Sequence, residues 1–92
     1  MVYLSDYLIE AHKSSTSNKK VLQSSETCCC FYCLHVYAPS EVIAWIDEDG
    51  ETALCPKCGV DAVIGSASGL PISESHFVED MHKKYFFKPI LS

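Results

Sequence analysis

Cys28-Cys29-Cys30-Phe31-Tyr32-Cys33 and Cys55-Pro56-Lys57-Cys58-Gly59 are the stretches that decide how this chain of 92 residues folds. Each contains two cysteines that are separated by two other residues, and twenty-one residues lie between Cys33 and Cys55. Two cysteines at this spacing in a tight turn can point both sulfurs at one ion, and two such turns complete a tetrahedron. The pattern therefore predicts one structural Zn²⁺ ion, held by Cys30, Cys33, Cys55 and Cys58.

The sequence leaves alternatives to this ligand set and to this metal. Cys29 also stands at a knuckle spacing from Cys33, although symmetry with the second pair favours Cys30. His35 lies just past the first pair and can be a ligand, a neighbour of the site or a surface residue. Iron fits the same all-sulfur cage, and paired cysteines also occur as redox dithiols.

The second stretch carries further backbone information. Pro56 restricts the turn, and Gly59 tolerates the left-handed conformation that such knuckles often need. The two stretches resemble the knuckles of zinc-ribbon and related zinc-knuckle proteins, and the resemblance covers residues 30–64. With a helix expected between the knuckles, a treble-clef-like arrangement stays open beside a ribbon. Residues 30–65 and the aromatic end of the chain are also similar to a group of short bacterial cytoplasmic proteins, a likeness that implies zinc and no particular activity.

Helices are predicted on both sides of this core. Apolar residues recur at helical spacing in residues 3–12, which predicts a short amphipathic helix. A second apolar stripe, together with Ser73 as an N-cap, predicts a helix over residues 73–87. Residues 14–18 are polar and poor helix formers, so we expect a flexible linker there.

Short elements are expected around and between the knuckles. Residues 21–23 favour a strand, and Pro39 followed by good helix formers predicts a helix over residues 40–47 that covers the metal with Val42, Ile43, Trp45 and Ile46. Residues 52–54 and 60–64 favour strands that enter and leave the second knuckle. We therefore expect a small α+β zinc-binding fold with flanking helices, in which residues 1–92 form one domain around a core at about residues 28–65.

Composition limits the partners. The net charge is -5, and all seven basic residues are lysines. Phosphate and base recognition depend strongly on arginine and on a concentrated basic face, so nucleic acid is an unfavoured partner. The sequence lacks an apolar run long enough to span a membrane and lacks an export signal, and we therefore expect a cytoplasmic protein.

The predicted function follows from the metal and the charge. Four cysteines fill a zinc shell and leave no position for a reacting water, so we do not expect an enzyme. We expect a protein-interaction or regulatory module, one form of which is an acidic inhibitor or immunity-type partner of a basic protein. The alternative is a nucleic-acid-associated zinc ribbon, which requires one face to gather Lys19, Lys20, Lys57, Lys83, Lys84 and Lys88. The sequence leaves the identity of the partner and the oligomeric state open.

Overall fold

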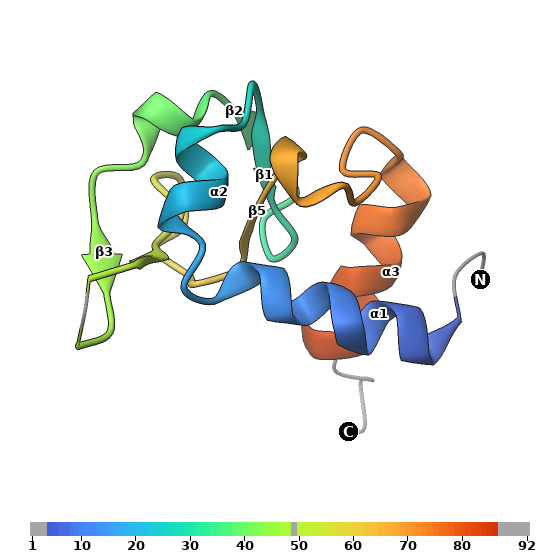
Figure 1. Ribbon diagram of the computed structural model, residues 1–92. Coiled ribbons are helices and arrows are strands. Elements are labelled where there is room, and N and C mark those ends of the chain that lie inside the picture. The colour runs from blue at the N-terminus through green and yellow to red at the C-terminus, as the bar shows by residue number, and fades with distance from the viewer. Residues whose placement is uncertain (1–3, 49, 87–92) are drawn as a thin grey trace.

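The computed structural model describes residues 4–48 and 50–86, and a three-stranded antiparallel sheet lies at its centre (Figure 1). Its strand order is β2-β1-β5, with β1 at Cys28–Cys30, β2 at Val36–Tyr37 and β5 at Val63–Gly65. In this sheet Cys28 lies opposite Tyr37 on one side and Gly65 on the other, and Cys30 lies opposite Val63. The central strand thus consists of three adjacent cysteines, all of them buried.

Helices and short turns surround the sheet. Helix α1 spans Ser5–His12, α2 spans Lys19–Gln23 and α3 spans Ser75–Phe86, with 3-10 turns η1 at Lys13–Ser15, η2 at Pro39–Glu41 and η3 at Ser66–Ser68. Helices α1 and α3 pack against each other on one side of the central sheet, while α2 packs against β5 and the turns η2 and η3 (Figure 1). In the described part of the chain, every helix is too short or too polar to cross a membrane.

The two longer helices lie where the apolar periodicity places them. Helix α1 covers residues 5–12 of the predicted helix 3–12. Leu4 is extended and precedes the helix, and residue 3 lies outside the described residues. Helix α3 begins at Ser75, and its first backbone bonds run from the N–H groups of Phe77 and Val78 to the carbonyl of Glu74. The predicted N-cap at Ser73 is therefore wrong, because Ser73 lies in the turn before the helix. Phe87, the last residue of the predicted helix, lies outside the described residues.

The predicted strand at residues 21–23 is wrong, because these residues end helix α2. A run of only three residues, two of them apolar, fits either structure, and tertiary packing decides between them. Helix α2 places the buried Leu22 against β5, where a Cβ atom added to Gly65 would lie 2.8 Å from Leu22 Cδ2 and 2.4 Å from Ser25 Oγ. The absence of a side chain at Gly65 is what allows this close approach.

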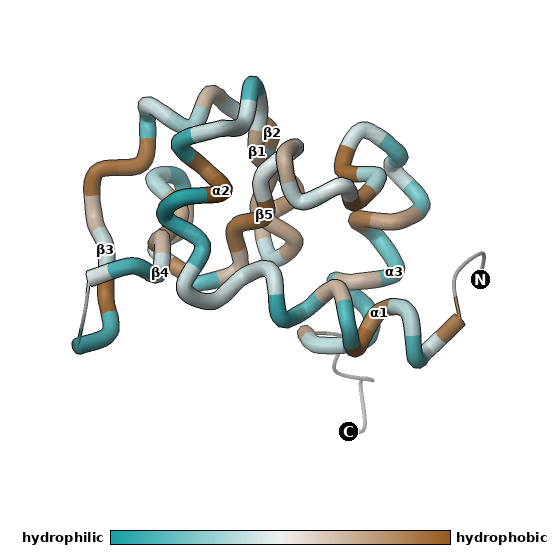
Figure 2. The backbone as a smooth tube through the Cα atoms, in the orientation of Figure 1, coloured by the Kyte–Doolittle hydropathy of each residue, from teal (hydrophilic) through white to brown (hydrophobic). Residues whose placement is uncertain are grey.

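The predicted helix at residues 40–47 is also wrong. After η2 the chain becomes extended, and β3 at Trp45–Ile46 pairs with β4 at Thr52–Ala53 to form a hairpin. Its β-branched and aromatic residues fit a strand better than a helix. Asp47 and Gly50 then reverse the chain with φ angles of 79° and 65°. Of the residues predicted to cover the metal, Ile43 is 85% exposed, whereas Val42 is buried and Trp45 packs against the core. Figure 2 shows apolar colour along this outer hairpin as well as in the centre.

The polar segment at residues 14–18 is ordered, contrary to the expected flexible linker. The Asn18 side chain is buried, and its Nδ2 donates to the carbonyls of Ser14 at 3.1 Å and Val63 at 2.7 Å. Its Oδ1 accepts from the N–H of Ala53 at 3.1 Å. One amide side chain thus joins β4 to β5, the two strands that flank the second knuckle.

Candidate metal centre

The first knuckle connects β1 to β2 through a tight turn. The N–H of Cys30 donates to the carbonyl of His35 at 3.1 Å, and the N–H of Leu34 donates to the carbonyl of Cys30 at 2.8 Å. A third N–H, from Tyr32, lies 3.4 Å from the sulfur of Cys30. These bonds fold the backbone around Cys30 so that Cys30 and Cys33 both reach the interior of the turn.

The second knuckle connects β4 to β5 and repeats the same three bonds. The N–H of Cys55 donates to Val60 at 3.0 Å, the N–H of Gly59 donates to Cys55 at 2.9 Å, and the N–H of Lys57 lies 3.3 Å from the Cys55 sulfur. Each bond joins the same relative positions as its counterpart in the first knuckle. Gly59 has a φ angle of 82°, the left-handed conformation predicted for it.

The equivalent residue in the first knuckle is Leu34, and it also has a left-handed backbone, with φ at 66°. A side chain is unfavourable in this conformation because its Cβ approaches the following carbonyl. The first knuckle thus adopts the geometry of the second without the glycine that suits it.

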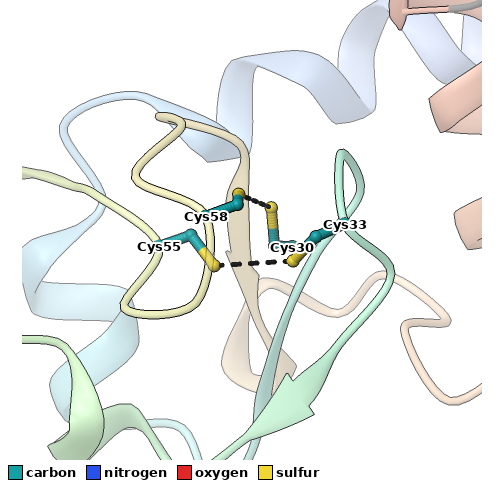
Figure 3. Close-up of side chains that lie close together, drawn as sticks. All are labelled: Cys30, Cys33, Cys55 and Cys58. Atoms are coloured by element: carbon teal, nitrogen blue, oxygen red, sulfur yellow. Dashed lines mark hydrogen bonds between the residues drawn. The ribbon is translucent and has the colours of Figure 1, made fainter.

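The two knuckles bring four sulfur atoms together, as Figure 3 shows. The sulfurs of Cys30, Cys33, Cys55 and Cys58 all lie within 4.8 Å of one another. The sulfurs of Cys30 and Cys58 are 3.6 Å apart, and those of Cys33 and Cys55 are 3.7 Å apart. Every cysteine is a free thiol, and these separations are far longer than a disulfide bond of about 2.05 Å.

These separations fit a tetrahedral metal. With a Zn–S bond of about 2.3 Å, neighbouring sulfurs of a regular tetrahedron stand about 3.8 Å apart. The Cys30–Cys58 and Cys33–Cys55 separations, 3.6 and 3.7 Å, are close to this edge length. The donor set is therefore placed to bind a metal ion, and all four positions of the tetrahedron belong to the chain.

Burial and hydrogen bonds act differently on the four thiols. Cys30 and Cys55 are buried, whereas Cys33 and Cys58 are partly exposed. Burial raises the pKa of Cys30 far above its ordinary value, and it also raises the pKa of Cys58. Burial acts in the same direction on Cys55, but the Tyr37 hydroxyl and backbone N–H groups of the knuckle outweigh it and lower the pKa of Cys55 to about 7. The fold thus favours the anion of Cys55 over the anions of Cys30 and Cys58.

The structure places the alternative ligands outside the sulfur cluster. Side chains alternate along a strand, so Cys29 points to the opposite face of β1 from Cys28 and Cys30. The Cys28 thiol lies 3.5 Å from the carbonyl of Tyr37. Burial raises the pKa of both Cys28 and Cys29 to about 12, so these thiols stay protonated. His35 is exposed, and its contribution to the knuckle is its backbone carbonyl.

His82 supports the first knuckle from helix α3, where the sequence predicts only a polar face. Its Nδ1 atom lies 3.0 Å from the carbonyl oxygen of Phe31, the residue that follows Cys30. His76, in contrast, is exposed and lies 3.9 Å from the carboxylate of Glu74. Spacing alone could not identify His82, because its contact reaches across 51 positions of the chain.

One residue of the acidic segment between β3 and β4, Asp47, has a structural role. The buried hydroxyl of Thr52 donates to the Asp47 carboxylate and accepts from the N–H of Ser17 at 2.8 Å. Asp47 therefore ties the hairpin turn to the segment before α2. Glu48, the next residue, is exposed.

Comparison of the chain with protein-family models, with curated proteins and with solved structures finds no match.

Proposed function

We propose that the chain binds one structural Zn²⁺ ion through Cys30, Cys33, Cys55 and Cys58, and that the zinc-stabilised fold acts as a protein-interaction module. The main observation in support of this proposal is the cluster of four sulfurs that lie within 4.8 Å of one another. Zinc favours closed tetrahedral thiolate sites of this kind in structural roles. Since the second knuckle leads into strand β5, the arrangement favours a ribbon over a treble clef.

A closed shell supports the structural role of the metal over a catalytic one. Catalytic zinc keeps a position for water or substrate, whereas four cysteines use all four positions. Metal binding then contributes directly to folding, because the unfolded chain has no preformed site. A small core with a three-residue central strand gains much from such a contribution.

The metal proposal is tested by elemental analysis of the protein purified under reducing conditions, together with thiol titration before and after chelation. We expect one zinc per chain and four thiols that become reactive only on chelation. One iron per chain together with a visible charge-transfer spectrum would show that the bound metal is iron and not zinc. Absence of any metal would overturn the proposal and leave the paired cysteines as redox candidates.

The outer edge of the central sheet supports the interaction role. Cys30 and His35 form a hydrogen-bonded pair, so the alternation of an antiparallel ladder turns the N–H and carbonyl of Val36 away from β1. Beside this edge lies a groove of about 300 Å³, whose lining residues are Leu34, Val36, Ile72, Ser73, Ser75, Val78 and Glu79. The side chain of Val36 is 62% exposed and that of Leu34 is 44% exposed.

This surface fits an extended segment of a partner protein. Such a segment can pair with the edge strand through its backbone and place alternate apolar side chains in the groove. Glu79 and the net charge of -5 favour a basic residue in that segment. An acidic inhibitor of a basic protein is the narrower form of this proposal.

The lysines of the described residues support the nucleic-acid alternative less well. Lys13 pairs with Glu10 at 3.0 Å, and Lys57 pairs with Glu41 at 3.2 Å. The Lys19 ammonium lies 5.3 Å from the centre of the Trp45 ring, near the hairpin, whereas Lys84 bonds to Ser5 at the contact of α3 with α1. These positions are distributed over different parts of the fold rather than gathered into one basic face.

Quantitative capture of interacting proteins tests the interaction role. We expect Val36→Glu to lose a partner that the wild-type protein and Ile43→Glu both retain, since Ile43 is an exposed apolar residue outside the groove. Equal capture by all three proteins would contradict the groove as the docking surface. A salt-sensitive shift of DNA or RNA by the wild-type protein would favour the nucleic-acid alternative instead.

A further inference from the structure

Tyr37 lies on the same face of the central sheet as the metal ligand Cys30. It stands directly opposite Cys28 in the register of β1 and β2, and directly opposed residues of an antiparallel pair share a face. Cys28 and Cys30 also share that face, because side chains alternate along a strand. The Tyr37 ring is therefore inside the fold beside the sulfur cluster, and only 6% of the residue is exposed.

The hydroxyl of Tyr37 lacks a satisfied hydrogen bond. It is the one buried side-chain oxygen or nitrogen of the described residues for which no atom meets the full geometry of a hydrogen bond. The Tyr37 side chain interacts directly with the side chain of Cys55, one of the four clustered cysteines. A phenol has an ordinary pKa of about 10, so at neutral pH the hydroxyl carries its proton and is a donor.

The missing partner of this donor is a charged acceptor. A thiol sulfur accepts hydrogen bonds weakly, whereas a thiolate carries a full negative charge and accepts them strongly. Ligand cysteines lose their protons when they bind a metal. Metal binding would therefore turn Cys55 into the acceptor that the buried hydroxyl of Tyr37 needs.

The net charge of the metal-bound centre also favours a hydrogen-bond donor beside the sulfurs. Four thiolates and one divalent cation leave a net charge of about -2, and a buried charge of this kind is costly unless donors surround it. Backbone N–H groups of Tyr32 and Lys57 already point at the sulfurs of Cys30 and Cys55. Tyr37 adds a side-chain donor, which a single substitution can remove.

We infer that Tyr37 is a positioning residue of the metal centre, whose hydroxyl donates a hydrogen bond to the Cys55 thiolate in the metal-bound protein. The inference rests on the proposed function, since it requires a metal at the four cysteines. Donors that contact metal ligands orient them and tune their charge, and their loss commonly weakens metal binding by about 10- to 100-fold. The hydroxyl thereby also shields the sulfur from electrophiles.

The test compares wild-type protein with Tyr37→Phe, which keeps the ring and removes the hydroxyl. Tyr32→Phe is the matched control, because Tyr32 stands between two ligands but is 43% exposed. Zinc affinity is measured by competition with a chelator, the thiolate-to-metal charge-transfer band by absorbance of the Co²⁺ form, and sulfur reactivity by alkylation of the zinc form. For Tyr37→Phe we expect zinc affinity about 10- to 100-fold weaker, a shifted band and faster alkylation at Cys55, and for the control no change.

The outcomes separate this inference from the proposed function. Failure of the wild-type protein to bind Zn²⁺ or Co²⁺ would overturn both. Metal binding by the wild-type protein, with an unchanged band and unchanged affinity in Tyr37→Phe, would overturn only the role of Tyr37. If Tyr37→Phe does not fold, ¹¹³Cd-substituted wild-type protein decides: we expect NMR coupling between cadmium and the Tyr37 hydroxyl proton. Coupling to the Lys57 amide proton without coupling to that hydroxyl would contradict the inference.

Discussion

The Nδ1 atom of His82 in helix α3 lies 3.0 Å from the carbonyl oxygen of Phe31 in the first knuckle. A carbonyl can only accept, so this nitrogen carries the proton. The Phe31 ring is buried, and it contacts the rings of His12, Tyr85 and Phe86. Helix α3 therefore holds the backbone between Cys30 and Cys33 through the carbonyl of Phe31. The Phe31 side chain packs between α3 and α1. The candidate metal centre and the helix pair form one packed unit.

Replacement of His82 by alanine tests this connection. We expect His82→Ala to lower the free energy of unfolding by about 1–2 kcal/mol, because a hydrogen bond and its ring packing are lost together. The matched control is His76→Ala, with an expected change of less than about 0.5 kcal/mol, because His76 is exposed and its ion pair is weak. Denaturant unfolding of the metal-bound proteins measures both values. Equal stability of the two variants would contradict a role for His82 at the knuckle.

Substitution of the cysteines separates ligands from buried neighbours. Serine at Cys30, Cys33, Cys55 or Cys58 should abolish binding of one metal per chain and unfold the middle of the chain, because metal binding contributes to folding. Alanine at Cys29 should keep the metal at a stability cost of about 1–2 kcal/mol, since it removes one buried sulfur. Elemental analysis and circular dichroism measure these outcomes. Full metal content in Cys30→Ser with loss of metal in Cys29→Ala would reverse the assignment.

Substitutions at Gly59 and Leu34, the left-handed residues of the two knuckles, should have opposite effects on stability. Gly59→Ala should cost about 1–2 kcal/mol through backbone strain alone, because a Cβ atom at Gly59 would meet no atom within 4 Å. Gly59→Asn should cost less, since asparagine tolerates this conformation. Leu34→Gly should be neutral or stabilising by up to about 1 kcal/mol, because relief of strain offsets the entropy of glycine. Thermal unfolding of the metal-bound proteins decides, and destabilisation by Leu34→Gly equal to that of Gly59→Ala would contradict the equivalence of the knuckles.

The buried Asn18 predicts a large effect outside the metal ligands. Asn18→Ala should destabilise the protein by about 2–4 kcal/mol, because it removes three hydrogen bonds and leaves the N–H of Ala53 and the carbonyl of Val63 without this partner. The exposed Gln23 on α2 provides a control, and we expect Gln23→Ala to change stability by less than about 0.5 kcal/mol. Chemical denaturation measures both. A loss below 1 kcal/mol for Asn18→Ala would show that other contacts hold β4 and β5 together.

The sequence predicts those features whose determinants are local. Cysteine spacing and the residues of the second knuckle indicate the sulfur cluster and the left-handed Gly59. Apolar periodicity places the two longer helices, because a stripe over two or more turns carries enough signal to identify a helix.

The errors occur where distant residues decide the structure. Residues 21–23 form the end of a helix because Leu22 packs on Gly65, which has no side chain. Trp45 and Ile46 form a strand rather than a helix because their pairing partner, β4, lies beyond Gly50. The polarity of residues 14–18 indicates a solvated segment, yet the Asn18 amide finds its partners on two strands. Tyr37 and His82 show the same limit, since no spacing rule connects them to the cysteines that they serve.

The hairpin of β3 and β4 lies wholly inside the loop that the two knuckles would close. The entropy cost of closing a loop grows only with the logarithm of its length, so doubling the loop adds about 0.6 kcal/mol. Residues inserted at the tip of this hairpin would therefore leave the closure of the loop almost unaffected. We therefore expect the tip of this hairpin to accept additional residues while the two turns that meet at the sulfurs keep their geometry.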